Sequence, residues 1–211
     1  MSETLGIIGA GHLGKQIANY AISDSHFSDI VFFDDFNKNS LTEENYRILG
    51  KTDTIFKSYK EGEFDKLIIG IGYKHLDYRK SFFEKFYNKI PFATIIHTSC
   101  FIAQDAIVEE GSILYPGCVV EPNTVIKKNT VLNISCAIAH DSVVGKHSFL
   151  SPKVAIAGFV NVGNQCILGI NSIIIDGVSL APKVQLGAGT VVINHIKKSG
   201  LYVGNPHRFI R

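Results

Sequence analysis

The sequence predicts two domains of different architecture, an α/β domain over residues 1–94 and a solenoid of short parallel strands over residues 95–196, followed by a C-terminal tail, 197–211. Two observations predict this division. Residues 95–196 divide into 17 consecutive hexads without an insertion, and the preceding segment has the strand, glycine turn and helix of a βαβ unit. A chain of 211 residues is long enough for two such domains.

In the α/β domain, a short apolar run over residues 5–9 is expected to be a strand that enters the turn Gly9-Ala10-Gly11-His12-Leu13-Gly14. Apolar residues at helical spacing then predict a helix around 17–22. Further strands are expected over 30–33, ending at Asp34 and Asp35, and over 66–71, before Gly72 and a second helix. Such a half-Rossmann unit could bind a mononucleotide, whereas NAD use or purely structural glycines remain alternatives.

The solenoid is predicted by two columns of the hexads. The second position is Ile, Val or Leu in every hexad from Ile96 to Val192, and the sixth is small or β-branched. One hexad cannot bury its aliphatic side chain alone, so coils of three hexads, 18 residues, should stack as parallel strands. Prolines occur at the fourth position, where a corner needs no ladder donor: Pro116, Pro122, Pro152 and Pro182.

All four cysteines, Cys100, Cys118, Cys136 and Cys166, occupy the small sixth position. Metal sites favour short paired spacings such as C-x-x-C, which this sequence lacks. We therefore interpret the cysteines as small core residues, neither metal ligands nor nucleophiles, and expect no metal cofactor.

The hexad pattern resembles the hexapeptide-repeat, left-handed β-helix acyltransferases, and the left hand is taken from that resemblance. With the N-terminal domain included, the chain resembles bacterial nucleotide-sugar acetyltransferases, both the sialic acid O-acetyltransferase type and the N-acetyltransferases of nucleotide-linked 4-amino-sugars. The resemblance implies acetyl-CoA as co-substrate and a homotrimer with acetyl-CoA between neighbouring solenoids. It also implies nucleotide-sugar contacts at Gly9, Gly11, His12, Asp34, Asp35 and Gly72.

The segment Ala137-Ile138-Ala139-His140-Asp141-Ser142 resembles the family's I-x-H-D/E element. This resemblance implies that His140 is the general base and that Asp141 tunes it. An imidazole suits proton removal from an attacking amine near neutral pH. Gly158, 18 residues later, leaves room over the imidazole, and its N–H is a candidate donor to the thioester oxyanion.

The resemblance further implies cofactor contacts near the groove between solenoids. The family's second histidine corresponds to Phe149, with His147 two places earlier, so either His147 compensates from another corner or this cofactor contact is lost. The candidate contacts are His147, Phe149, Gly158, Gly169, Lys183, Gly187, Ala188, Asn205 and Pro206. Corner glycines also satisfy tight turns without any ligand, which is the alternative for the glycines here.

Composition narrows the function classes. A net charge of +2 argues against nucleic acid as a partner, and no apolar run approaches membrane-spanning length. The N-terminus lacks the pattern of a secretory signal, so we expect a cytoplasmic protein. The expected function is N-acetylation of a nucleotide-linked amino-sugar, such as a 4-amino-4,6-dideoxy sugar for polysaccharide biosynthesis. Alternatives are O-acetylation of a sialic acid or related hydroxyl, a carbonic-anhydrase-like zinc protein, and a non-catalytic nucleotide-sugar-binding scaffold.

Overall fold

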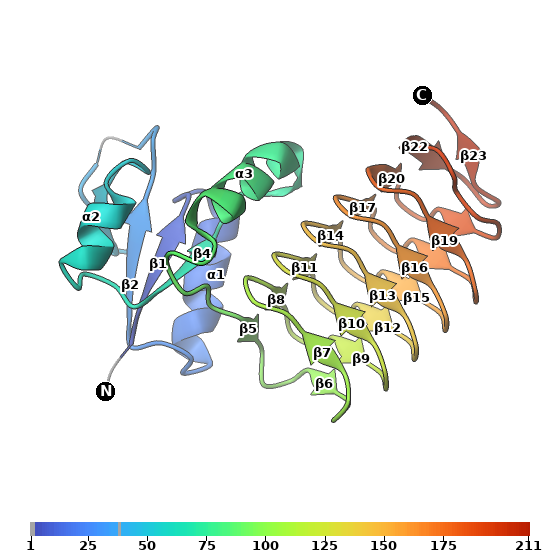
Figure 1. Cartoon of the computed structure of the whole chain (residues 1–211), viewed down its shortest axis with the longest axis horizontal. Coiled ribbons are helices and arrows are strands. Elements are labelled where there is room, and N and C mark those ends of the chain that lie inside the picture. The colour runs from blue at the N-terminus through green and yellow to red at the C-terminus, as the bar shows by residue number, and fades with distance from the viewer. Residues whose placement is uncertain (1–2, 38) are drawn as a thin grey trace. The chain divides into compact units, whose positions relative to one another are not determined.

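The computed structural model describes residues 3–37 and 39–211. The chain divides into two compact units, one up to Ile95 and one from Ile96 onward (Figure 1). This boundary lies one residue from the division that the hexads predict. Among the described helices, none combines the length and apolar character needed to cross a membrane.

The first unit contains a four-stranded parallel sheet in the order β3-β2-β1-β4. The strands are β1 (Thr4–Ile8), β2 (Asp29–Phe33), β3 (Arg47–Gly50) and β4 (Lys66–Ile69), and the helices are α1 (His12–Ser23), α2 (Ile55–Lys60), the 3-10 helix η1 (Tyr73–His75) and α3 (Leu76–Phe86). The predicted strands and both predicted helices are present, although β4 ends two residues before the predicted end. The strand β3 and the short helix α2 were not predicted.

Close packing of α1 on the sheet depends on Gly14. A β-carbon at Gly14 would lie 2.0 Å from the carbonyl oxygen of Gly9, and one at Gly70 would lie 2.7 Å from the Gly14 Cα. Gly9 itself has a φ of +97°, which other residues rarely adopt. These glycines bring the start of α1 against the carboxyl ends of β1 and β4, the edge at which parallel α/β sheets bind ligands.

The second unit is a solenoid with three faces (Figure 1). The first face consists of β5 (Ile95–Ile96), β8 (Ile113–Leu114), β11 (Val131–Leu132), β14 (Phe149–Leu150), β17 (Ile167–Leu168), β20 (Val184–Leu186), β22 (Gly200–Val203) and β23 (Arg208–Phe209). The second consists of β6 (Phe101–Ile102), β9 (Val119–Val120), β12 (Ala137–Ile138), β15 (Ala155–Ile156), β18 (Ile173–Ile174) and β21 (Val191–Val192). The third consists of β7 (Ile107–Val108), β10 (Val125–Ile126), β13 (Val143–Val144), β16 (Asn161–Val162) and β19 (Ser179–Leu180).

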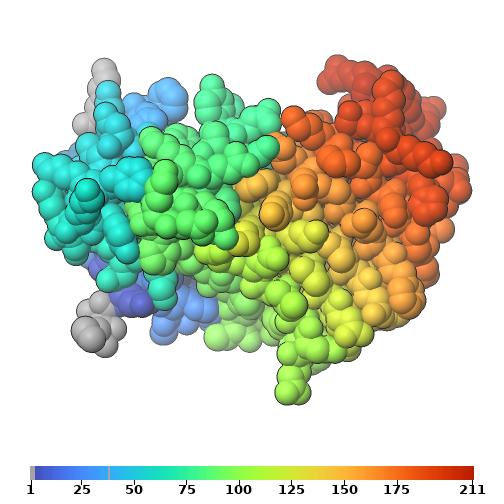
Figure 2. Space-filling model, in the orientation of Figure 1, coloured from blue at the N-terminus to red at the C-terminus, as the bar shows by residue number. Residues whose placement is uncertain are grey.

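The strand register confirms the 18-residue coil, because Val125 pairs with Ile107 on one side and Val143 on the other. Second-position aliphatics from Leu114 to Val192 are buried and form one continuous core. In the space-filling view, successive coils follow one another in sequence order along the solenoid (Figure 2). The register and the continuous core mean that each inward side chain packs against its counterparts in the neighbouring coils.

The corners require a left-handed backbone at the fifth hexad position. Every such residue from Gly111 to Gly189 has a positive φ, between 55° and 76°. Glycine, asparagine and aspartate tolerate this conformation best, and they fill eight of these corners: Gly111, Gly117, Asn123, Asn129, Asp141, Asn171, Gly177 and Gly189. A side chain at this position projects from the corner in the same way in each coil.

The residues beyond 196, predicted as a separate tail, extend the first face instead. Strand β22 pairs in parallel with β20, and β23 returns antiparallel to β22. The tail therefore completes the last coil of the solenoid.

The cysteines pack as the sequence predicted. All four are free thiols; Cys118, Cys136 and Cys166 are buried, and Cys100 is half-buried. Burial raises the pKa of the Cys166 thiol to about 11. A buried, protonated thiol is a poor nucleophile, so this cysteine is a structural residue.

Candidate active site

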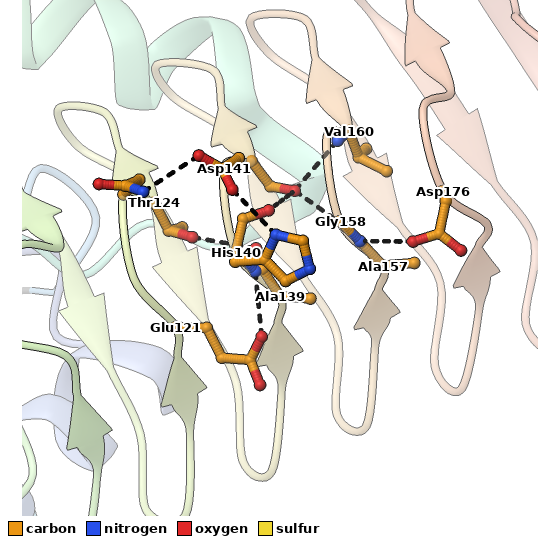
Figure 3. A network of polar contacts seen from close by, with 11 residues as sticks. Glu121, Thr124, Ala139, His140, Asp141, Ala157, Gly158, Val160 and Asp176 are labelled. Atoms are coloured by element: carbon orange, nitrogen blue, oxygen red, sulfur yellow. Dashed lines mark hydrogen bonds and ion pairs between the residues drawn. The ribbon is translucent and has the colours of Figure 1, made fainter.

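His140 and Asp141 contact each other at the corner that follows β12, between the second and third faces. Nδ1 of His140 lies 2.9 Å from Oδ2 of Asp141 (Figure 3). The two side chains are 47% and 36% exposed, so the imidazole is accessible to a substrate. The structure brings together the two residues that the sequence assigned to proton transfer.

Neighbouring coils hold this pair from several directions. The backbone N–H of His140 donates to Oε2 of Glu121 at 3.1 Å, and Nδ2 of Asn123 donates to Oδ1 of Asp141 at 3.1 Å. Ser142 donates through Oγ to the carbonyl oxygen of Ala157 at 2.9 Å, which ties this corner to the next coil. Sequence reasoning missed Glu121 and Asn123, although the 18-residue period places both in the coil preceding His140.

Gly158 lies one coil beyond His140 and leaves the space that the imidazole occupies. A β-carbon at residue 158 would lie 2.8 Å from Cε1 and 3.0 Å from Nε2 of His140. The Phe159 ring stands edge-on to the imidazole, with centroids 5.1 Å apart and an interplanar angle of 86°. Gly158 and Phe159 thus restrict where the imidazole can lie.

The N–H of Gly158, which the sequence offers as an oxyanion donor, has an acceptor within the chain. In the structure this N–H donates to Oδ1 of Asp176 at 3.0 Å (Figure 3). A thioester oxygen would have to displace this carboxylate before it could accept from the N–H. The structure supports Gly158 as a space-making residue beside His140.

A shallow pocket of about 280 Å³ covers the second face next to His140. Its floor consists of four alanines on β12, β15 and the residues after them: Ala137, Ala139, Ala155 and Ala157. Glu121 and Asp176 line it as well, with Val119 and Ile173 among its apolar residues. None of the described lining residues is basic, so the pocket combines an apolar floor with two acidic side chains.

Several of the expected cofactor contacts lie at a different corner, between the first and second faces. A β-carbon at Gly169 would lie 2.5 Å from the carbonyl oxygen of Leu186, and one at Gly187 would lie 2.9 Å from Cγ1 of Val203. The close approach of the next coil therefore accounts for a glycine at both positions, and no ligand is needed to explain them. Ala188, Asn205 and Pro206 are exposed. Within one chain, the second face separates this corner from that of His140.

Apart from Gly158, the remaining expected cofactor contacts are not at the His140 corner either. His147 lies between the third and first faces, is 6% exposed, and has Nδ1 2.9 Å from Nδ2 of Asn129. Phe149, on β14, is 5% exposed. Burial of both side chains argues against the prediction that one of them contacts acetyl-CoA. Lys183 is exposed at the same corner as His147.

A second pocket, of about 570 Å³, lies in the first unit where β1, β2 and β4 end. It brings together five of the six residues assigned to the nucleotide-sugar: Gly9, Gly11, Asp34, Asp35 and Gly72. His12, exposed at the start of α1, is not among the lining residues. Sequence reasoning missed Thr52 and the aromatic residues of this pocket, Phe36, His75, Tyr78 and Phe82. Phe36 is 93% exposed, an unusual placement for a large apolar ring.

The two acidic side chains of this pocket, Asp34 and Asp35, accept hydrogen bonds from other residues of the first unit. Oδ2 of Asp34 accepts from the N–H of Ala10 at 2.7 Å, and Oδ1 accepts from the N–H of Phe36 at 2.8 Å. Asp35 accepts from the N–H of Thr52 at 2.8 Å and from its hydroxyl. Asp34 thus ties the loop after β2 to the glycine turn, so its first role is to shape the pocket.

Zinc binding was one alternative for the histidines. His140 and His147 lie at different corners, and in the described part of the chain no group of three or more His, Cys, Asp or Glu side chains is placed to hold a metal ion. The described residues therefore offer no support for the zinc interpretation.

Comparison with family models found a match to the N-terminal unit. Residues 4–86 match the family model described as the PglD N-terminal domain. Comparison with curated protein sequences found no significant match.

Solved structures resemble the whole chain. The acetyltransferase domain of PglB from Neisseria gonorrhoeae FA1090, in complex with acetyl coenzyme A, has a TM-score of 0.90 and 23% identity and covers 100% of both chains. PerB from Caulobacter crescentus, in complex with CoA and GDP-perosamine, has a TM-score of 0.90 and 22% identity and covers 99% of this chain and 97% of its own. WeeI from Acinetobacter baumannii AYE has a TM-score of 0.71 and 20% identity, covering 98% and 99%. These likenesses confirm the predicted fold class, an α/β domain followed by a left-handed parallel β-helix.

Proposed function

We propose that this protein transfers an acetyl group from acetyl-CoA to the amine of a nucleotide-linked amino-sugar, with His140 as the general base. The observation that carries the proposal is the accessible imidazole of His140, oriented by Asp141 at 2.9 Å and adjoining an apolar pocket. The donation of an Nδ1 proton to Asp141 leaves the lone pair on Nε2, the nitrogen that can accept a proton.

In the proposed reaction, the neutral amine nitrogen attacks the thioester carbonyl and a C–N bond forms. The nitrogen loses its proton to Nε2 of His140, and the Asp141 carboxylate stabilises the imidazolium. The C–S bond then breaks, and CoA leaves as a thiolate that takes the proton from the imidazolium. No covalent enzyme intermediate is needed, and general-base catalysis of this kind contributes about 10²–10⁴-fold to the rate.

The charge of the pocket favours an amine over a hydroxyl as acceptor. Glu121 and Asp176 line the pocket, and Asp141 adjoins it, so the corner holds three acids beside one imidazole. Acidic side chains attract a sugar that carries an ammonium group more strongly than one that carries a neutral hydroxyl. The bound ammonium loses one proton to solvent before its neutral nitrogen attacks. PerB, which was solved with CoA and GDP-perosamine and is described as a perosamine N-acetyltransferase, supports the same acceptor class.

The nucleotide part of the acceptor is proposed to bind the pocket of the first unit. This pocket adjoins Gly11, the N-cap of α1, where no side chain caps the helix. Backbone N–H groups at such a helix start suit a diphosphate. Phe36 and Tyr78, which are 93% and 65% exposed, offer ring faces to a base.

The site is proposed to be completed by a second copy of the chain in a homotrimer. In one chain, the corner with Gly169, Gly187 and Ala188 is separated from His140 by the second face. One acetyl-CoA molecule could contact both kinds of corner if each came from a different chain of the trimer. We place this activity in the cytoplasm, in the synthesis of sugars for polysaccharides.

The test is release of free CoA thiol when purified protein is incubated with acetyl-CoA and nucleotide-linked sugars that differ only in an amine or a hydroxyl. We expect turnover with the amine and loss of about 10²–10⁴-fold in His140→Ala. His26→Ala, which removes an imidazole paired with Asp24 at 3.0 Å in the first unit, should retain turnover. Wild-type turnover by His140→Ala would contradict the base assignment.

The same assay separates the rival functions. Preference for the hydroxyl sugar would identify an O-acetyltransferase. Binding of nucleotide sugars by calorimetry, without thiol release from any of them, would identify a non-catalytic binding protein and would overturn the proposal.

A further inference from the structure

Asn123 and Asp141 occupy equivalent places in adjacent coils. Both stand at the fifth hexad position of the corner between the second and third faces, 18 residues apart, with φ angles of 58° and 55°. Their side chains therefore leave the corner in parallel directions, and Nδ2 of Asn123 donates to Oδ1 of Asp141 at 3.1 Å. The coil period places residue 123 beside residue 141, and the side-chain conformations bring the amide to the carboxylate.

The contact leaves each oxygen of Asp141 with its own partner. Oδ1 accepts from Asn123, and Oδ2 lies 2.9 Å from Nδ1 of His140. Rotation about χ2 of an aspartate is otherwise broad, and an exposed carboxylate can turn its oxygens away from a neighbour. A donor fixed to Oδ1 keeps Oδ2 directed at the imidazole, so the Nδ1–H tautomer is favoured and Nε2 carries the lone pair.

We propose that Asn123 is a positioning residue for the general base, acting through Asp141. This inference rests on the proposed function, because it assigns the relay Asn123–Asp141–His140 to proton transfer. Neither the I-x-H-D/E element nor the glycine turns include Asn123. A purely structural alternative exists, since asparagine also suits the left-handed backbone of a corner.

A glycine substitution separates the two roles. Asn123→Gly keeps a left-handed backbone without strain and removes only the amide. We expect kcat to fall about 10-fold or more, in the range of other orienting residues, with KM for both substrates and the melting temperature unchanged. Asn123→Asp replaces the donor by a second carboxylate and should lower kcat further. Asn88→Gly makes the same change at an exposed residue with a left-handed backbone in the first unit, φ 61°, and should retain wild-type kcat.

A double-mutant cycle tests whether Asn123 acts through Asp141. In an Asp141→Gly background, which also tolerates the left-handed backbone, Asn123→Gly should cause no further loss of kcat. Additive losses would overturn the relay and favour a separate structural role. Equal kcat in wild type and Asn123→Gly would overturn it as well.

Nitrogen-15 NMR of the imidazole provides a readout that does not depend on turnover. In wild type, we expect the His140 ring shifts of the Nδ1–H tautomer, and in Asn123→Gly a shift toward a mixture of tautomers. If wild type showed no acetyl transfer but the ring shifts changed as expected, the proposed function would fail and the positioning role would stand. Unchanged ring shifts in Asn123→Gly would remove the positioning role, whatever the activity.

Discussion

The imidazole of His140 lies where a side chain of residue 158 would otherwise stand. Built on the Gly158 backbone, a β-carbon would come within 2.8 Å of Cε1 of His140, closer than van der Waals contact permits. The absence of a side chain in one coil therefore sets the position of a functional group in the preceding coil. Asp141 fixes the imidazole from the other direction, 2.9 Å from Nδ1.

Gly158→Ala should move the imidazole away from Asp141 and lower kcat about 100-fold, because a displacement near 1 Å costs about that much in catalysis. Steady-state acetyl transfer measures the loss. Combined with His140→Ala, the alanine at 158 should cause no additional loss, since the group that it displaces is gone. A further decrease in the double variant would mean that Gly158 acts through another contact, such as its N–H to Asp176.

Asp141→Asn should lower kcat without changing the melting temperature. Asparagine tolerates the left-handed φ of 55° at this corner, so the backbone is not strained. The amide has no negative charge to stabilise the imidazolium, and we expect a loss of about 10–100-fold, smaller than that of His140→Ala. A variant with wild-type kcat in the amine assay would show that the contact between His140 and Asp141 plays no part in proton transfer.

Phe36→Ala tests the nucleotide pocket. Phe36 is 93% exposed, so its removal should leave stability unchanged, and loss of base stacking should raise KM for the nucleotide-sugar about 10-fold. KM for acetyl-CoA should remain as in wild type. Phe209→Ala, which removes a ring 44% exposed on β23, is the matched control. Equal effects of the two variants would place the nucleotide elsewhere.

Leu132→Ala should destabilise the solenoid by about 2–5 kcal/mol, the usual cost of a large aliphatic deleted from a packed core. Leu132 is fully buried and pairs in register with Leu114 and Leu150. Ile134→Ala, two residues later and 41% exposed, should change the free energy of unfolding by less than about 0.5 kcal/mol. Urea unfolding measures both, and similar losses would contradict the stacked core.

The free energy of unfolding should fall between about pH 9 and pH 11, and Cys166 should contribute to that fall. Burial raises the pKa of this thiol from its ordinary value of 9.0 to about 11, so the folded chain keeps a proton that the unfolded chain loses. The contribution is complete below pH 9 and is lost as the pH rises through that window. Cys166→Ala should unfold with a shallower pH dependence, whereas an identical slope in both proteins would show that the thiol does not contribute.

Fold prediction succeeded where a short-range period controls the structure and failed where it does not. The aliphatic column from Ile96 to Val192 predicted the coils, since the hexad position decides whether a side chain points inward. Strand β3 was not predicted because its residues are partly or fully exposed and do not alternate between buried and exposed positions. Helix α2, at six residues, is too short to display a helical period.

The sequence by itself determined the coil and the proximity of His140, Asp141 and Gly158, since a six-residue period converts sequence spacing directly into position. Only the tertiary structure decided which polar atoms meet. It placed the Gly158 N–H on Asp176, turned Asn123 toward Asp141, buried His147 and used Asp34 to hold the glycine turn. These outcomes depend on side-chain rotamers and on competition among donors from separate coils or loops, which spacing along the chain does not encode.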